Sequence, residues 1–282
     1  MNLKNLIDTI QSPQWLIDAS GVLYSDQGFL PKSSETFKYL QSKGPTFLAS
    51  NNSYHYVNDI VINLKKEGDI ILDPNAIISS GHGLAKDPEI RQIISNKIVY
   101  FIGPESAKHY ALDAPVKGLT QQLDNAEVII LSGLHKNEAP EIIKTIIDFS
   151  KKNPAIPIIC CNKDHYIRAH HGLQPVVGYF ASIIEKEINK SIHWFGKPLK
   201  NYSMLVKDHL AQSNLKPTHE TIFFDDNIEN IVSMQTHIGI SGCWVIKTGI
   251  FSEENKTELI KTYGKPVYSI NSFSLDDVVE KY

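Results

Sequence analysis

The chain has 282 residues, of which 42% are hydrophobic and 21% charged, a composition typical of globular proteins that allows one large or two medium domains. Its formal net charge of -3 gives no reason to expect nucleic acid or an anionic membrane surface as a partner. No secretory signal is visible at the N-terminus, and no apolar run approaches the roughly 18 residues that a membrane helix needs, so we expect a cytoplasmic protein.

The first predicted strand ends at an aspartate. Leu16 and Ile17 belong to an apolar run that is followed by Asp18 and then by a turn at Gly21. Short apolar runs bounded by turn residues are typical of strands, and ligands of open α/β sheets bind beyond the carboxyl ends of the strands. The pattern therefore places Asp18 at a ligand crevice, although a strand that merely ends in a capping aspartate is the commoner explanation of this segment alone.

The second predicted strand, at residues 46–49, runs into four small polar side chains. Ser50, Asn51, Asn52 and Ser53 offer hydroxyl and amide groups that are able to hold an anion. Amphipathic helices are predicted on both sides of this segment in the sequence.

The apolar spacing predicts helices at residues 31–41 and 58–67. We expect Ser33 or Ser34 to cap the first helix and a glycine to follow the end of each. These patterns indicate packing and carry no chemistry.

The pattern starts afresh after residue 83. Apolar strands are predicted at residues 98–102, 128–131 and 156–161, with a helix at residues 141–149. This block is large enough to form a small domain of its own.

The three cysteines are Cys160, Cys161 and Cys243. Adjacent cysteines cannot easily bridge each other, and an odd count argues against a disulfide framework. We therefore expect buried structural thiols.

A lysine follows the next apolar stretch. Residues 193–195 run into Lys197 on a tight turn, just before a helix that Pro198 could start. A solvated turn lysine is the commoner explanation of such a pair taken alone.

An acidic pair follows a further strand. Residues 221–224 lead into Asp225 and Asp226, and Asn230 lies four residues beyond Asp226, on the same side of the helix that we expect next. A helix cap would explain the acidic pair as well. The segments at 243–246 and 275–280 are predicted to complete the core, and the alternation of strands and helices predicts a parallel α/β sheet.

In this order, the segments resemble the haloacid dehalogenase superfamily of phosphotransferases. Within it, they are similar to the class IIA group of nucleotide, p-nitrophenyl phosphate and pyridoxal phosphate phosphatases. The segments that carry the resemblance are residues 18–23, 50–53, 161–164, 196–198 and 225–230.

The resemblance implies a Rossmann-like α/β core with a parallel sheet and an inserted α/β cap domain. The core would be formed by residues 1–81 and 191–282, and the cap by residues 82–190. It further implies a small phosphorylated metabolite as substrate, and caps of this group often mediate homodimers.

Site roles follow from the same resemblance, with Asp18 as a nucleophile that forms an aspartyl-phosphate. The expected catalytic residues are Asp18, Ser20 and Lys197. The expected substrate-binding residues are Ser50, Asn51, Asn52, Asn162 and Asp164.

A divalent cation is expected beside the nucleophile, because phosphoryl transfer needs charge neutralisation and positioning. Mg²⁺ prefers oxygen ligands, including one or two carboxylates. The expected ligands are Asp18, the backbone carbonyl of Ser20, and Asp226, with Asp225 and Asn230 orienting them.

Ser20 is a departure from the family pattern, in which a second aspartate stands two residues after the nucleophile. That carboxyl group acts as general acid and base, a role typically worth about 10²- to 10⁴-fold in rate, and a serine hydroxyl fills it poorly. His170 or His171 could replace it, although adjacent loop histidines are more often simply exposed.

Three functions remain open on the sequence. The first is a Mg²⁺-dependent phosphatase or phosphotransferase of the EC 3.1.3 type that is slow because Ser20 replaces the acid. The second is a catalytically impaired protein that binds a phosphate ligand or has a regulatory role. The third is a dehalogenase, against which Asp225 and Asp226 argue because dehalogenation needs no metal.

Overall fold

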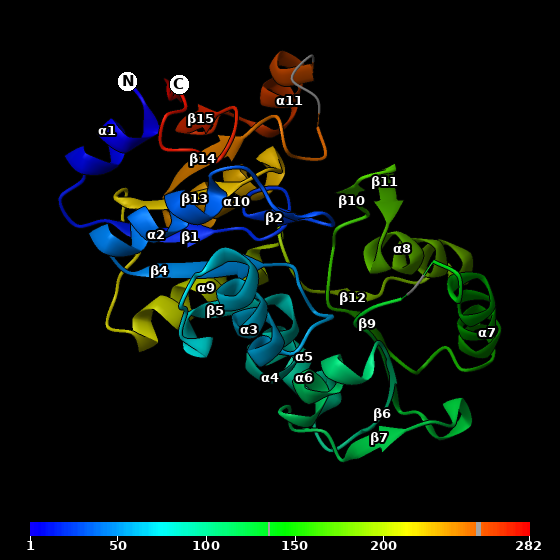
Figure 1. The fold of residues 1–282 in the computed structure, drawn as a ribbon. Coiled ribbons are helices and arrows are strands. Elements are labelled where there is room, and N and C mark those ends of the chain that lie inside the picture. The colour runs from blue at the N-terminus through cyan, green and yellow to red at the C-terminus, as the bar shows by residue number, and fades with distance from the viewer. Residues whose placement is uncertain (135, 252–254) are drawn as a thin grey trace.

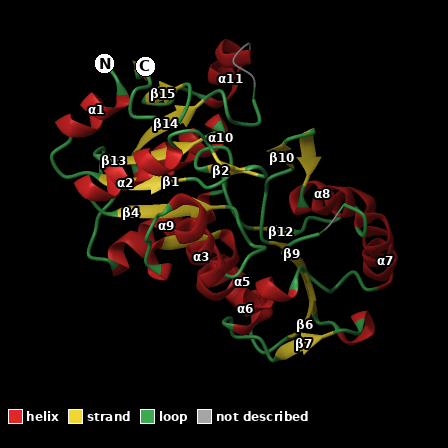
Figure 2. Cartoon of the chain, in the orientation of Figure 1, coloured by secondary structure: helices red, strands yellow, loops and turns green. Residues whose placement is uncertain are grey.

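The computed structural model describes residues 1–134, 136–251 and 255–282. Within these residues the chain forms two mainly parallel sheets with helices packed on them, joined by loops that run between the two sheets (Figure 1). Figure 2 shows the strands of both sheets in yellow and the helices in red. The predicted fold class is confirmed: the chain is α/β, with a Rossmann-like parallel-sheet core and a second, inserted α/β unit.

The larger sheet is built from both ends of the chain, and each neighbouring pair of strands is parallel except the last pair at one edge, which is antiparallel. In spatial order its strands are β16 (Glu280–Lys281), β15 (Tyr268–Ile270), β14 (Ser241–Val245), β13 (Thr221–Asp225), β1 (Gln14–Ile17), β4 (Thr46–Ser50) and β5 (Ile77–Ser79).

Helices cover both faces of this sheet, so its central strands are buried along their whole length. Successive side chains of a strand point to opposite faces, and accordingly Leu16 packs in one hydrophobic cluster while Trp15 and Ile17 pack in the other. One face is covered by α1 (Leu3–Thr9), α2 (Ser33–Lys43) and α3 (Val57–Gly68), and the other by α9 (Lys200–Gln212), α10 (Ile228–Ile238) and α11 (Lys256–Tyr263).

The second sheet is parallel throughout and has the order β12-β9-β8-β6-β7. Its strands are β6 (Ile98–Ile102), β7 (Gly118–Thr120), β8 (Val128–Leu131), β9 (Ile158–Cys160) and β12 (His193–Trp194). Helices α7 (Ala139–Lys152) and α8 (Val177–Ile188) pack on one face of it.

Short elements complete the described chain. Two antiparallel hairpins are formed by β2 (Tyr24–Ser25) with β3 (Gly28–Phe29) and by β10 (Tyr166–Ala169) with β11 (Gly172–Pro175). The remaining helices are α4 (Gly83–Lys86), α5 (Pro88–Ile94) and α6 (Lys108–Leu112), with 3-10 turns η1 (Pro74–Ala76), η2 (Ser80–His82), η3 (Glu105–Ala107) and η4 (Leu123–Asn125).

One predicted detail is wrong. The helix predicted at residues 31–41 begins after Lys32, whose φ is 63° and whose side chain makes no capping hydrogen bond, and the hydroxyl of Ser33 donates instead to the carbonyl of Leu23 at 2.6 Å. The segment at residues 275–280 packs Leu275 and Val279 against the core, as expected, whereas β15, which was not predicted, pairs with β14.

Other expectations are confirmed. The strands predicted at residues 98–102 and 128–131 begin and end where expected, and all three cysteines are free and buried. No helix in the described part of the chain has the length and apolar character needed to cross a membrane. The division of the chain after residues 81 and 190 stays a prediction, and β12, just beyond the second of these boundaries, pairs with β9 of the second sheet.

Candidate active site

Neighbouring strands of the larger sheet deliver three carboxylates to one edge. Asp18 directly follows β1, Asp225 is the last residue of β13, and Asp226 comes next. Because β1 and β13 are parallel neighbours, their carboxyl ends coincide. One carboxylate oxygen from each of the three aspartates lies within 4.8 Å of the others. This confirms the close approach expected from the positions of these residues at strand ends.

A lysine from the segment after β12 reaches into the same place. The side chain of Lys197 is only 2% exposed, and its Nζ donates to Asp18 Oδ1 and to Asp225 Oδ2, each at 2.7 Å. A third bond goes to the carbonyl of Ala49 at 3.2 Å. Lys197 is therefore a buried ion-pair partner and not the solvated turn residue that its neighbourhood in the sequence allowed.

Asn51 holds the main chain of this lysine. Its Oδ1 accepts from the Lys197 N–H at 2.7 Å and its Nδ2 donates to the Lys197 carbonyl at 3.0 Å. Gly196 is required beside it, because its φ of 116° is left-handed and a Cβ there would lie 2.8 Å from Asn51 Oδ1. The amide of Asn51 thus positions Lys197.

Asp225 is oriented by the helix that follows it. Its Oδ1 accepts from the N–H of Asn227 at 2.8 Å and from Asn230 Nδ2 at 3.1 Å. The helix α10 is capped by Asn227, whose side chain accepts from the N–H of Glu229, so neither aspartate of the acidic pair is the cap. Asn230 is 3% exposed and its buried Oδ1 has no hydrogen-bond partner within the described protein.

Burial shapes the protonation of the cluster. It raises the pKa of Asp18 to about 7, against the opposing charge of Lys197. Burial and then the charges of Asp225 and Asp18 raise the pKa of Asp226 well above its usual range. Burial alone would lower the pKa of Lys197, but the charges of Asp18 and Asp225 outweigh it and hold that pKa well above its usual value.

The turn after Asp18 packs directly on the acidic pair. Gly21 has a left-handed φ of 81°, and a Cβ at this position would lie 2.4 Å from Asp226 Oδ2. Only glycine meets both conditions. The close approach brings the 18–21 turn, including Ser20, against Asp226.

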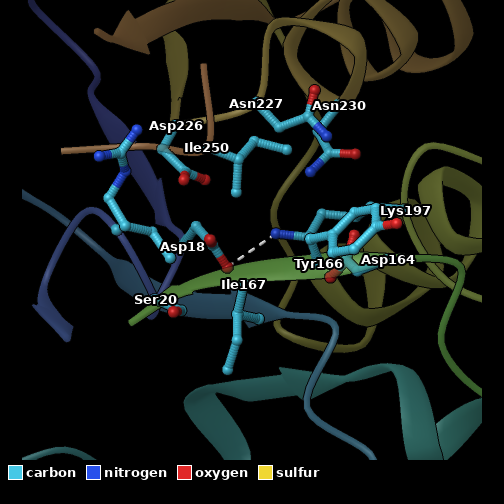
Figure 3. Close-up of a pocket in the computed structure, with 12 residues that line it drawn as sticks. Asp18, Ser20, Asp164, Tyr166, Ile167, Lys197, Asp226, Asn227, Asn230 and Ile250 are labelled. Atoms are coloured by element: carbon cyan, nitrogen blue, oxygen red, sulfur yellow. Dashed lines mark hydrogen bonds and ion pairs between the residues drawn. The ribbon is translucent and has the colours of Figure 1, made fainter. Parts of the chain in front are cut away.

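These groups surround a cavity of about 40 Å³, shown with its lining residues in Figure 3. A water molecule occupies about 30 Å³ of liquid volume, so the space accommodates an ion or a water molecule in this conformation. The lining residues are Asp18, Ser20, Gly21, Asp164, Tyr166, Ile167, Arg168, Lys197, Asp226, Asn227, Asn230 and Ile250.

The β10–β11 hairpin forms one wall of this cavity through Tyr166, Ile167 and Arg168. Arg168 Nε donates to the carbonyl of Gly249, and at the tip of the hairpin the N–H of His170 donates to Asp26 Oδ2 at 2.8 Å. These three lining residues were not predicted as site residues, although they lie just after the 161–164 segment that carries part of the family resemblance.

The remaining expected site residues are divided between the cavity and its surroundings. Asp164 lines the cavity, and burial raises its pKa to about 6. Ser50 is buried at the end of β4 but is absent from the cavity lining. Asn52 accepts from the N–H groups of Tyr54 and His55, and Asn162 Oδ1 accepts from the N–H of Asp164 at 2.7 Å.

The two histidines considered as replacement acids lie at the turn of the hairpin. His170 Nδ1 is 2.7 Å from Gln27 Nε2, and neither His170 nor His171 lines the cavity. In this conformation His170 joins the hairpin to the β2–β3 turn.

The N-terminal part of the chain is similar to a known protein family. Residues 15–117 match the family described as haloacid dehalogenase-like hydrolase. A search of curated proteins finds no match. The match includes Asp18 and the 50–53 segment.

Solved structures extend the similarity to almost the whole chain. A possible sugar phosphatase of the haloacid dehalogenase superfamily from Cytophaga hutchinsonii is 21% identical, with a TM-score of 0.81 and 97% of each chain covered. A p-nitrophenyl phosphatase from Archaeoglobus fulgidus is 22% identical, with a TM-score of 0.75 over 93% of this chain and 97% of that one.

A 4-nitrophenylphosphatase from Thermotoga maritima is 20% identical, with a TM-score of 0.75 over 96% of this chain and 97% of that one. At these identities the likeness establishes the fold. The family match supports the predicted resemblance to the haloacid dehalogenase superfamily for residues 15–117, which include the 18–23 and 50–53 segments.

Proposed function

We propose that this chain is a slow, Mg²⁺-dependent phosphohydrolase that acts on a small phosphomonoester through an aspartyl-phosphate at Asp18. The charge of the buried cluster is the observation that carries the proposal. Asp18, Asp225 and Asp226 contribute three negative charges when ionised and Lys197 one positive charge, which leaves a formal charge of -2. Buried charge of this size demands either protonation or a bound cation.

The donor set suits a hard divalent cation. The grouped ligand atoms are all carboxylate oxygens, which Mg²⁺ prefers, and the unpartnered Oδ1 of Asn230 adds a further oxygen to the same cavity. Asp18, the carbonyl of Ser20, and Asp226 would hold the ion, with Asp225 and Asn230 orienting them. The ion would neutralise charge on the phosphoryl oxygens.

The chain's own residues supply the other parts of the reaction. Lys197 fixes Asp18 through Oδ1, so the second oxygen of Asp18 is the one that would attack phosphorus as the bond to the leaving oxygen breaks. Water would then hydrolyse the aspartyl-phosphate. Asn51 acts by holding Lys197, and Ser50 at the end of β4 is expected to donate to the phosphoryl group.

The similar structures add limited support. They include a possible sugar phosphatase, a p-nitrophenyl phosphatase and a 4-nitrophenylphosphatase. We therefore propose p-nitrophenyl phosphate, an ester with a good leaving group, as the first assay substrate. A good leaving group also reduces the need for the acid that Ser20 cannot supply.

The test is a phosphatase screen of small phosphomonoesters with added MgCl₂, in which Asp18→Asn serves as the blank. Turnover by the wild type that is absent from Asp18→Asn supports the proposal. Equal turnover by the two proteins would assign the activity to a contaminant and contradict it.

We expect the substitution Ser20→Asp to raise the turnover number for p-nitrophenyl phosphate by about 10²-fold, because it restores a carboxyl group able to donate and accept a proton. Ser20→Asn is the control, since it has similar size and cannot titrate. A folded Ser20→Asp protein that is no faster than the wild type would argue against the role given to this position.

A catalytically impaired phosphate-ligand binder is the second candidate, and Ser20 is the observation that favours it. That function predicts saturable, Mg²⁺-dependent binding of a phosphomonoester without release of inorganic phosphate. Calorimetry of binding, run beside an assay of phosphate release on the same protein, separates the two candidates.

A further inference from the structure

A second cavity, of about 360 Å³, lies away from the candidate active site and shares none of its lining residues. Its volume falls within the range of about 300–1,000 Å³ that is usual for small-molecule pockets. The described lining residues are Tyr54, Tyr100, Phe101, Ile102, Gly103, Pro104, Gly133, Leu134, Glu138 and Ile142.

The topology of the second sheet explains why a cavity forms here. From β6 the chain moves to β7 on one side and then crosses back to β8 on the other side. Connections that leave two neighbouring parallel strands in opposite directions, here β6 and β8, open a crevice beyond the carboxyl ends of those strands. Parallel α/β sheets bind ligands in such crevices. Gly103 and Pro104 follow β6, Gly133 and Leu134 follow β8, and all four line the cavity.

The cavity is closed on one side by a residue attached to the larger sheet. Ser53 Oγ donates to the carbonyl of Ser132 at 2.6 Å, and Ser132 Oγ donates to the carbonyl of Ser53. This pair of hydrogen bonds between the two segments places Tyr54 against Gly133, where an added Cβ would lie 2.2 Å from the tyrosine ring. The path of the loop after β4 toward the second sheet is visible in Figure 1.

The lining indicates the chemistry of an occupant. Tyr54, Tyr100 and Phe101 supply aromatic rings that are only partly buried, and Glu138 supplies an exposed carboxylate. Tyr54 and Glu138 both line the cavity, and burial, and after it the charge of Glu138, raises the pKa of Tyr54. The charged group among the described lining residues is a carboxylate, which favours a cationic ligand.

We propose that this cavity binds a small aromatic molecule that bears an ammonium group. Ring stacking on Tyr100, which packs on the α7 face of the sheet, cation–π contact and an ion pair with Glu138 would hold it. The site is independent of the proposed phosphatase activity, because it rests on a different cavity and on different residues.

Three indole compounds that differ only in the polar group of the side chain test the proposal: tryptamine carries an ammonium, indole-3-ethanol a hydroxyl and indole-3-propionate a carboxylate. Calorimetry with the full chain should rank their affinities in that order, with about a tenfold difference between the first and the last, equivalent to about 1.4 kcal/mol. Equal affinities, or no binding of tryptamine, would overturn the proposal.

Variants locate the binding. Glu138→Gln should weaken tryptamine severalfold and leave indole-3-ethanol unchanged, whereas Glu141→Gln, an exposed acid on the same helix outside the lining, should change neither. Tyr100→Leu should weaken all three compounds. Loss of tryptamine binding in Asp226→Asn would place the cation in the acidic cluster and refute the assignment, and the Glu138 comparison remains decisive should Tyr100→Leu fail to fold.

Discussion

Lys197 is the residue on which the candidate site depends, because it neutralises part of a buried carboxylate cluster. Each of its two short ion-pair contacts joins it to a side chain on the larger sheet, while its own backbone continues from the second sheet. A charge this deeply buried is tolerated only when it is paired and hydrogen-bonded. We therefore expect the removal of Lys197 to lower the stability of the fold as well as the rate of catalysis.

We expect Lys197→Met to lower the free energy of unfolding by about 3–5 kcal/mol at pH 8 in metal-free buffer, because Asp18 and Asp225 are left uncompensated. At pH 5 the loss should be smaller, since the cluster takes up protons. Urea denaturation measures both values. Lys200→Met removes an exposed cation three residues away and should be nearly silent; an equal loss in both variants would contradict the expectation.

A pH dependence follows from the raised pKa of Asp18. The folded state holds a proton on this group up to about pH 7, whereas the unfolded chain releases it near 3.8. The folded state therefore binds more protons in this window, and the contribution of Asp18 to stability falls as the pH rises from about 4 to about 7.

We expect Asp18→Asn to gain stability relative to the wild type across that window, with no further change in the difference above about pH 8. Urea denaturation in EDTA from pH 4.5 to 8.5 measures the difference. A difference that is independent of pH would show that Asp18 ionises normally in the folded protein.

The sequence predicted the cluster well at the level of single residues. Asp18, Asp225 and Asp226 follow apolar runs, and parallel strands bring such positions to one edge. The role of Asn51 could not be predicted in the same way, because its partner is a backbone 146 residues away whose path depends on the whole fold. Asn52, which caps a local turn, was grouped with it only because the two are adjacent.

The β10–β11 hairpin is the element that controls access to the site in this conformation. Its tip is joined to the β2–β3 turn through Asp26 and Gln27, and its first strand is joined to Gly249 by Arg168. The first strand of the hairpin lines the cavity, so any movement that widens the cavity on this side has to break these contacts.

We expect Asp26→Ala to speed amide hydrogen exchange in residues 166–175 severalfold and to leave the two sheets unchanged, because it removes the acceptor of the His170 N–H. Exchange followed by mass spectrometry reads both regions at once. Asp124→Ala, a substitution in η4, is the control, and unchanged exchange in the hairpin of Asp26→Ala would mean that other contacts hold it.

The sequence was less informative about elements than about residues. Helix interiors and buried strands were found from their spacing, but β10 and β15 were not, since a short exposed hairpin and a three-residue edge strand have little periodicity to detect. Ser33 was expected to cap the helix because serine is a frequent helix cap. Its hydroxyl instead donates a hydrogen bond to a carbonyl of the preceding turn.

At the scale of the whole molecule, the candidate site is assembled from both sheets and from segments that are far apart in the sequence. Asp18 and the acidic pair come from the larger sheet, whereas Lys197 and Asp164 follow strands of the second sheet. Repulsion between the like charges buried at this junction therefore lowers the stability of the folded state. A ligand that relieves this repulsion should stabilise the entire fold.

We expect MgCl₂ to raise the melting temperature of the wild type, by an amount that corresponds to about 2.7 kcal/mol when the ion is present at a hundred times its dissociation constant. NaCl at matched ionic strength controls for screening. Asp226→Asn removes a ligand and half of the excess charge, so its melting temperature should already be higher in metal-free buffer and should respond little to Mg²⁺. A Mg²⁺ response of equal size in wild type and Asp226→Asn would place the ion elsewhere. It would then contradict the charge argument on which the proposed activity rests.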